Sequence, residues 1–242
     1  MDLQIELTDY CNVKCIYCSQ HMDTGVHPGY KKGMMSYSNF KKIIDDFESL
    51  SIGDPKHIVF QWLGESTSHP KFSKFMKYVL DKNEKNNFLN NVSWVSNVIT
   101  LDVDTVKLMC EISNKFTEIL FELSIDAFLP DTFASIKKCS EKKFNSVIEN
   151  VKTIINYSNN PEKNILVGIR FIVLEENYRE VDDFIQFWME YCDDNNIQYT
   201  LVSGGAGAPT KVKISIWPYL GAWGKILNED LYEDVLKRYS LT

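Results

Sequence analysis

The sequence predicts an α/β fold, an open and partial (β/α)6 barrel of parallel strands. Apolar segments of strand length recur six times along the chain, and five of them are followed by a segment with helical spacing of apolar residues. This alternation is typical of a parallel sheet with right-handed crossover helices. In such barrels the functional side chains lie at the carboxyl ends of the strands, and the candidate residues below fall there.

The first third of the chain holds two strand–helix units. Residues 3–7 alternate as a short strand that ends just before three closely spaced cysteines. Ser36 is expected to cap a helix that runs to about residue 50. Residues 57–63 predict the second strand, and Pro70 suits the first turn of the helix that follows.

Four more strands are expected in the remainder of the barrel, at residues 92–96, 119–125, 165–174 and 197–202. Helices are expected from Asp102, from Pro130, over residues 144–157 and after Asn177. Asn177 with Glu180 resembles a capping box, in which the two side chains satisfy the first backbone N–H groups of a helix.

The chain is expected to contain one main unit and an extension. Residues 1–202 make the predicted barrel core, and residues 203–242 make a C-terminal extension packed on it. Residues 203–209 are rich in Gly and Ala, which predicts a sharp turn. The segment after it is less regular and carries an apolar patch that includes Ile214, Ile216 and Trp217.

Composition excludes several classes of protein. Of 242 residues, 44% are hydrophobic and 24% are charged, with a formal net charge of −7, which argues against nucleic-acid binding. No apolar run approaches the length of a membrane span, and the N-terminus lacks the pattern of a signal peptide. We therefore expect a cytoplasmic protein without membrane contact, in which six cysteines indicate metal binding or catalysis before disulfides.

Cys11, Cys15 and Cys18 form a CxxxCxxC motif directly after the first predicted strand. The [4Fe–4S] clusters of ordinary electron carriers are held by four thiolates. Three cysteines on one loop leave one iron without a protein ligand. That open position can bind a small molecule through nitrogen and oxygen, which makes the motif catalytic in character.

This motif resembles the signature of the radical S-adenosylmethionine (SAM) superfamily, in which an aromatic residue, here Tyr17, precedes the third cysteine. The resemblance implies one [4Fe–4S] cluster on Cys11, Cys15 and Cys18 that binds SAM and cleaves it reductively. The products it implies are methionine and a 5′-deoxyadenosyl radical, which abstracts hydrogen from a substrate. It also implies an electron donor such as flavodoxin or ferredoxin.

The alternative is a noncatalytic zinc-binding or interaction module. Zinc requires four closed ligands, commonly from two paired CxxC units. The sequence has a single triplet, and His21 or His27 would have to complete a Cys3His site. The agreement of later segments with the cluster interpretation favours the enzyme.

Residues 61–70 resemble the family segment that follows the second strand, with Gly64, Glu65 and a His-Pro pair. Leu63 and Ser66 replace the usual glycine and proline. The glycine allows a close backbone approach, and by resemblance the Glu65 carboxylate accepts a hydrogen bond from the ammonium of SAM. The alternative is a solvated loop glutamate, and the flanking His-Pro pair favours the SAM contact.

Two further strand ends carry polar residues. Asn97 ends the third strand, where many relatives have Thr-Asn-Gly, and Val98 replaces that glycine. Ser124 and Asp126 match a Ser-Ile-Asp element of the family after the fourth strand, and alternation places both on one face. By resemblance these residues contact SAM or substrate, while Asp126 is equally suited to cap the next helix.

Arg170 lies in the apolar fifth strand, and a buried arginine needs a carboxylate partner. The methionine carboxylate of SAM and a structural salt bridge are equal candidates for that partner. The substrate is left open between a peptide and a small metabolite. Although residues 217–224 resemble the start of a family extension with auxiliary clusters, no cysteine follows Cys192 and we expect no auxiliary cluster.

Overall fold

A computed structural model describes residues 1–21, 32–50, 56–101, 103–111, 116–205, 207–220 and 226–241. Its centre is a seven-stranded sheet in which each neighbouring pair is parallel. The strand order is β1-β2-β3-β4-β5-β7-β6. The strands are β1 (Asp2–Ile5), β2 (His57–Phe60), β3 (Asn91–Ser96), β4 (Glu118–Ser124), β5 (Ile165–Ile172), β6 (Tyr199–Ser203) and β7 (Val212–Trp217).

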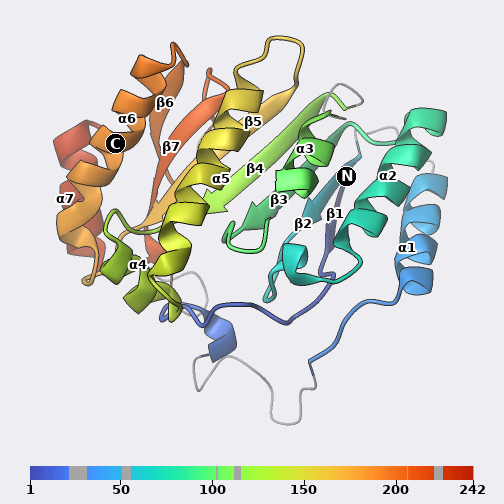
Figure 1. The fold of residues 1–242 in the computed structure, drawn as a ribbon, viewed down its shortest axis with the longest axis horizontal. Helices are drawn as coiled ribbons and strands as arrows, with labels where there is room; N and C mark the ends of the chain where they lie inside the picture. The colour runs from blue at the N-terminus through green and yellow to red at the C-terminus, as the bar shows by residue number, and fades with distance from the viewer. Residues whose placement is uncertain are drawn as a thin grey trace.

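Helices cover the outer face of this curved sheet (Figure 1). They are α1 (Tyr37–Ser49), α2 (Phe72–Asn86), α3 (Val103–Glu111), α4 (Pro130–Lys137), α5 (Lys142–Ser158), α6 (Val181–Asp194) and α7 (Glu229–Tyr239). Short 3-10 turns occupy Ser19–His21, Ser66–Ser68 and Tyr178–Glu180. A small antiparallel pair, β8 (Tyr219–Leu220) and β9 (Ile226–Leu227), precedes α7.

Strand alternation divides the sheet into two chemically different faces. On the face under the helices, Phe60 stacks on Trp94 at 5.8 Å and Trp94 on Phe121 at 5.4 Å between ring centroids. The Phe40 ring of α1 packs on this row, with its centroid 6.4 Å from that of Phe60. Because successive side chains of a strand point to opposite faces, Glu122 and its polar neighbours lie on the concave face, away from the helices.

All six predicted strands are confirmed with shifted ends, as are the helices that follow the first five. The second strand stops at Phe60, so the remainder of the predicted segment forms the loop beside the cysteines. Ser36 caps α1 as predicted, since its Oγ accepts the Asn39 N–H at 3.1 Å. The helix expected from Asp102 begins at Val103, and Asp102 lies outside the described residues.

The segment after residue 203 differs from the prediction. Val212–Trp217 is a strand, β7, that enters the sheet between β5 and β6. The predicted sixth strand therefore lies at the edge and does not neighbour β5. The sequence analysis missed β7 because a parallel neighbour normally requires a crossover of a dozen or more residues, and the connection here spans only residues 204–211.

The capping box predicted for Asn177 and Glu180 is absent in this structure. Asn177 instead donates to the Asp126 and Ile172 carbonyls at 2.8 Å each. Glu180 Oε2 accepts the Phe128 N–H at 2.8 Å and a second N–H from the residue after it. Both side chains therefore stabilise the connection between β4 and α4.

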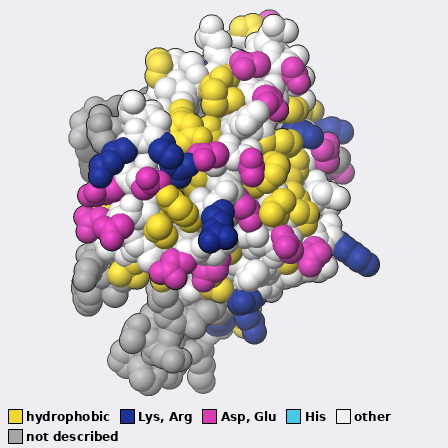
Figure 2. All heavy atoms as spheres, turned by 90° about the vertical axis from the view of Figure 1, so that its left-hand side faces the viewer, with side chains coloured by type: hydrophobic (Ala, Val, Ile, Leu, Met, Phe, Trp, Pro, Cys, Tyr) yellow, Lys and Arg dark blue, Asp and Glu magenta, His cyan; other side chains and the backbone are white. Residues whose placement is uncertain are grey.

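The face formed by α6 and α7 carries charges of both signs. Figure 2 shows Lys and Arg side chains singly or in pairs among Asp and Glu side chains on this face. It shows no continuous basic surface there. Within the described part of the chain, no helix is long and apolar enough to cross a membrane.

Candidate active site

The cysteine loop, which follows β1 and carries Cys11, Cys15 and Cys18, is hydrogen-bonded to the end of α4. Lys14 N–H donates to the Lys137 carbonyl and Ile16 N–H to the Ile136 carbonyl, both at 3.0 Å. These two carbonyls belong to the last turn of α4, which has no intrahelical donors left for them. The loop therefore runs across the carboxyl edge of the sheet, as the blue segment in Figure 1 shows.

Cys11 and Cys15 line a cavity of about 310 Å³ at this edge. All three motif cysteines are free thiols. Burial raises the pKa of Cys11 to about 11 and also raises that of Cys15. Burial thus favours the protonated thiol unless a bound cation compensates the thiolate charge.

The arrangement of these thiols differs from a single-ion site. In the described ranges, no three His, Cys, Asp or Glu side chains are grouped closely enough to hold one metal ion. A four-iron cluster bonds each cysteine to a different iron, so it accommodates thiols spread more widely than a zinc ion does. Three thiolates and a polar cavity beside them are a donor set that fits such a cluster. The side chain of His21 and all of His27, the zinc ligands considered from sequence, lie outside the described residues.

Gly64 is required by a close contact between backbones. A Cβ on Gly64 would lie 1.8 Å from the Thr8 carbonyl oxygen. Glu6 Oε1 accepts the N–H groups of Leu63 and Gly64 at 2.8 and 3.2 Å, and Glu65 N–H donates to the Tyr10 carbonyl at 3.0 Å. The loop after β2 is therefore held against the residues that lead into Cys11.

The Glu65 carboxylate is buried and surrounded by neutral donors. Its Oε1 accepts from the Thr67 N–H and hydroxyl at 3.2 and 2.7 Å and from the Ser96 hydroxyl at 3.1 Å. Its Oε2 accepts one bond, from the Asn97 N–H at 2.8 Å. Burial raises the pKa of Glu65, and these hydrogen bonds offset part of that increase. Oε2 retains a lone pair for a further donor.

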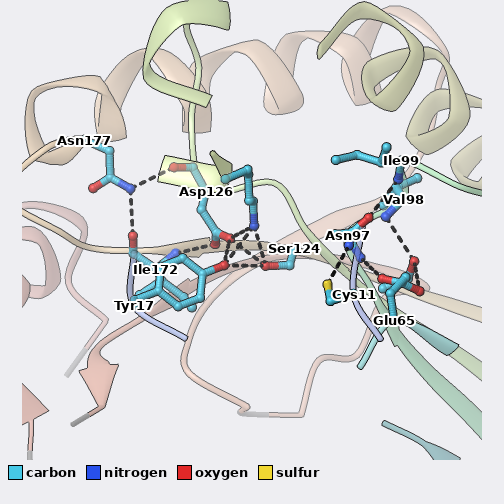
Figure 3. Close-up of polar contacts among 12 residues, drawn as sticks. Cys11, Tyr17, Glu65, Asn97, Val98, Ile99, Ser124, Asp126, Ile172 and Asn177 are labelled. Carbon is cyan, nitrogen blue, oxygen red and sulfur yellow. Dashed lines mark hydrogen bonds and ion pairs between the residues drawn. The ribbon is translucent and has the colours of Figure 1, made fainter. Parts of the chain in front are cut away.

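Asn97 connects the loop after β3 with the cysteine loop. Its Nδ2 donates to Asn12 Oδ1 at 2.8 Å and to Cys11 Sγ at 3.7 Å (Figure 3). The next residue, Val98, has φ +66°, a left-handed conformation that strains a β-branched residue. The loop therefore keeps the turn that a glycine would make, although valine occupies the position.

A second buried network lies on the opposite side of the cavity. Lys137 is 1% exposed and forms an ion pair with Asp126, which is fully buried. Tyr17 OH donates to Asp126 Oδ2 at 2.7 Å, and Lys137 Nζ lies 2.8 Å from the same hydroxyl and 3.1 Å from Ser124 Oγ. Figure 3 shows Tyr17, Ser124 and Asp126 converging on this point.

Asp126 neither caps a helix nor lines the cavity. Its Oδ1 accepts the Ile172 N–H at 2.9 Å and its Oδ2 accepts from the lysine, the tyrosine and Ser124, the last at 2.5 Å. Burial alone would raise its pKa, but Lys137 and Arg170 together hold that pKa below its ordinary value. The residue is thus a charged anchor for Tyr17 and Ser124, which do line the cavity.

Arg170 reaches the same cavity from β5. It makes no ion pair with a carboxylate in the part of the chain that the structure describes, and its Nε is buried without a hydrogen-bond partner there. Its guanidinium lies 5.6 Å from the ring centroid of Trp217. The structural salt bridge considered from sequence is therefore not found among the described residues.

The structure brings most sequence-predicted residues together. Those that line the cavity are Cys11, Cys15, Tyr17, Gly64, Glu65, Asn97, Ser124 and Arg170. Cys18 and Asp126 are not among the residues that line it. Sequence analysis missed Lys137, whose signal was a lysine directly after the apolar positions Phe133 and Ile136 of a helix. Trp62, 68% exposed, also lines the cavity.

The comparison with protein families agrees with this geometry. The model of the radical SAM superfamily matches residues 5–187. This chain belongs to the radical SAM superfamily. It is therefore an enzyme of a class that uses a [4Fe–4S] cluster and SAM.

Curated relatives with similar sequences are GTP 3′,8-cyclases. GTP 3′,8-cyclase of Desulforamulus reducens is 23% identical over 188 residues, which are 78% of this chain and 51% of the relative. GTP 3′,8-cyclase of Clostridium botulinum (strain Hall) is 22% identical over 189 residues, 78% of this chain and 53% of the relative. The radical SAM chain described here thus spans about half the length of the curated relatives it matches.

Solved structures share the radical SAM fold. Native anSMEcpe with bound AdoMet and Cp18Cys peptide has a TM-score of 0.63 at 16% identity, covering 99% of this chain and 58% of that one. Streptococcus suis SuiB bound to S-adenosylmethionine has a TM-score of 0.57 at 15% identity, covering 99% and 47%. At these identities the likeness establishes the partial-barrel α/β fold and leaves the substrate open.

Proposed function

We propose that this chain holds one [4Fe–4S] cluster through Cys11, Cys15 and Cys18 and cleaves SAM reductively in the adjoining cavity. The observation that carries the proposal is the cavity itself, which gathers two of these thiols with the polar ends of β2, β3, β4 and β5. When bound, cluster and SAM supply a 5′-deoxyadenosyl radical that abstracts hydrogen from the substrate. The protein contributes binding, orientation and exclusion of water.

Glu65 and Asn97 are the proposed contacts for the amino end of SAM. Glu65 Oε2 faces the cavity with one accepted bond, so it can receive an N–H from the SAM ammonium in a charge-assisted contact. Asn97 positions both the glutamate and Cys11 through its own N–H and side-chain amide. Gly64 sets the distance between this loop and the cysteine loop.

Ser124, Tyr17 and Arg170 are proposed to contact SAM from the other side. Asp126 and Lys137 hold the hydroxyls of Tyr17 and Ser124 in place, and both hydroxyls border the cavity. Arg170 provides a guanidinium without a carboxylate partner among the described residues. We propose that its terminal amines meet the carboxylate of SAM.

Two substrate classes follow from the similar proteins. The anSMEcpe and SuiB structures contain peptides, Cp18Cys and the precursor peptide SuiA, which favours a peptide substrate. The curated relatives act on GTP, which favours a small metabolite. We also propose that a low-potential carrier such as flavodoxin or ferredoxin donates the electron.

The test is anaerobic reconstitution with iron and sulfide, followed by dithionite and SAM, with 5′-deoxyadenosine measured by mass spectrometry. We expect about four irons per chain and formation of 5′-deoxyadenosine. Cys15→Ala should abolish the product and leave the circular dichroism spectrum unchanged, whereas Cys110→Ala, a buried cysteine on α3, should keep both. Undiminished product from Cys15→Ala, or a colourless zinc protein, would contradict the proposal.

A further inference from the structure

A polar row crosses the concave face of the sheet next to the cysteine cavity. The strand register places Ser124 of β4 opposite Arg170 of β5, and Arg170 opposite Ser215 of β7. Residues in register on neighbouring strands point to the same face. Phe121, three residues before Ser124, stacks within the aromatic row under the helices, so Ser124 and its partners face the other way.

Three donors in this region have no acceptor within the part of the chain that the structure describes. Ser215 is fully buried, and its Oγ has no hydrogen-bond partner among the described residues. The same holds for Arg170 Nε and Trp217 Nε1. Trp217 follows Ser215 by two residues, so alternation places both side chains on one face, and its ring lies against the Arg170 guanidinium. Buried donors without acceptors are costly, so three together indicate a ligand that supplies acceptors.

The charges on this face favour an anion. Glu122 is paired with Lys213 at 2.5 Å, and Asp126 is paired with Lys137. Each of these carboxylates therefore has its own lysine. Arg170 is left as the cation of this face that has no ion pair within the described residues.

We propose that Arg170, Ser215 and Trp217 bind a carboxylate or phosphate group carried by the substrate. This inference rests on the proposed function for the position of SAM. The predicted SAM contacts Glu65 and Asn97 follow β2 and β3, whereas Ser215 and Trp217 belong to β7, beyond β5.

Arg170 connects the two ligands. It lines the cavity that contains Cys11 and Cys15, and it is the register partner of Ser215. An arginine has five N–H donors, so its terminal amines can serve SAM while Nε remains for the second anion. A substrate held through its anionic group on β7 would then extend over SAM from the far side of β5.

The experiment titrates the reconstituted, SAM-loaded full chain with inorganic phosphate, pyrophosphate and acetate at constant ionic strength, with chloride as the reference. We expect saturable binding of at least one of these probes by calorimetry. Ser215→Ala should weaken that binding about tenfold, because it removes one buried hydrogen bond to a charged group. Trp217→Phe keeps a ring against the guanidinium, removes the N–H and should weaken binding in the same direction.

Ser158→Ala is the matched control. Ser158 is as buried as Ser215, but it lies in α5 and its hydroxyl donates to the Ile155 carbonyl at 2.7 Å. This variant should lower the unfolding midpoint and leave anion affinity unchanged. Ser215→Ala should weaken anion binding and leave the unfolding midpoint unchanged, because the Ser215 hydroxyl has no hydrogen-bond partner to lose among the described residues.

Two results would overturn the inference. One is that none of the three anions binds the wild-type protein above the chloride reference. The other is that Ser215→Ala raises the Kd of SAM and that the anions compete with SAM, since the donors would then belong to the SAM carboxylate. Iron content and 5′-deoxyadenosine, measured on the same preparation, report separately on the proposed radical chemistry.

Discussion

Two buried carboxylates belong to the hydrogen-bond networks on either side of the cavity, and they are held in opposite ways. Glu65, in the loop after β2, accepts four hydrogen bonds from neutral donors. Asp126, after β4, is paired with Lys137 and lies near Arg170. Burial raises the pKa of Glu65, whereas the two cations hold the pKa of Asp126 below its ordinary value.

The Glu65 carboxylate can therefore accept a positive charge from a ligand, whereas the charge of Asp126 is already neutralised by Lys137. Glu65 has a negative charge whose neighbours are neutral, so an added cation such as an ammonium is favourable there. Asp126 has its cation built in, and a ligand gains nothing from it directly. Asp126 therefore acts by positioning Tyr17 and Ser124, while Glu65 is suited to direct contact with a ligand.

The largest expected effect follows from breaking the Asp126–Lys137 pair. Lys137→Met leaves a buried carboxylate without its cation and should lower the free energy of unfolding by about 3–5 kcal/mol. Urea denaturation measures this change. Asp126→Asn introduced together with Lys137→Met should recover part of the loss. A single Lys137→Met variant as stable as the wild type would show that the pair is not what holds this side of the cavity.

Gly64→Ala tests the backbone contact on the Glu65 side. The added Cβ would meet the Thr8 carbonyl oxygen, so the two loops must separate, at a cost of about 1–3 kcal/mol. Because the cysteine loop follows Thr8 directly, we also expect fewer irons per chain after reconstitution. Gly207→Ala, where a Cβ meets nothing within 4 Å, is the control. Full iron content in Gly64→Ala would mean that the loops can part without disturbing the cysteines.

Glu65→Ala tests the proposed ligand contact. The variant should raise the Kd of SAM by about tenfold or more, the effect of one charge-assisted hydrogen bond, while iron content changes less. Equilibrium dialysis of the reconstituted protein with SAM and an iron assay give the two quantities. Loss of iron with SAM affinity preserved would assign Glu65 to cluster assembly instead.

The smallest effect is expected for Tyr17→Phe. The phenol hydroxyl donates to Asp126 at 2.7 Å and accepts from Lys137 at 2.8 Å, but the ion pair survives its removal. We expect a loss of about 1 kcal/mol in the free energy of unfolding. A loss as large as that of Lys137→Met would show that the tyrosine, and not the lysine, organises the network.

Local sequence patterns predicted an element correctly where a single feature, such as apolar spacing or a capping residue, was enough to define it. Apolar segments located all six predicted strands, and Ser36 capped α1 as its residue type indicates. The same kind of rule failed at Asn177 and Glu180. Their side chains could reach unpaired backbone groups of the β4–α4 connection, which no local pattern encodes.

β7 was missed for a related reason. Val212, Ile214 and Ile216 alternate as a buried strand should, but strand position in a sheet depends on where the chain returns. The sequence shows the alternation of apolar residues in β7, but only the structure shows that β7 lies between β5 and β6. A role for Ser215 of β7 can be proposed only from its register with Arg170 of β5.

The sequence by itself determined the family, the alternating α/β architecture, the three cysteines and the residues expected around them. These depend on spacing along the chain, which can be read directly. Only the tertiary structure decided that Lys137 neutralises Asp126, that Glu65 is left with neutral donors and that Ser215 lies beside Arg170. Those facts depend on distances between residues far apart in the chain, because charge and hydrogen bonding act through space.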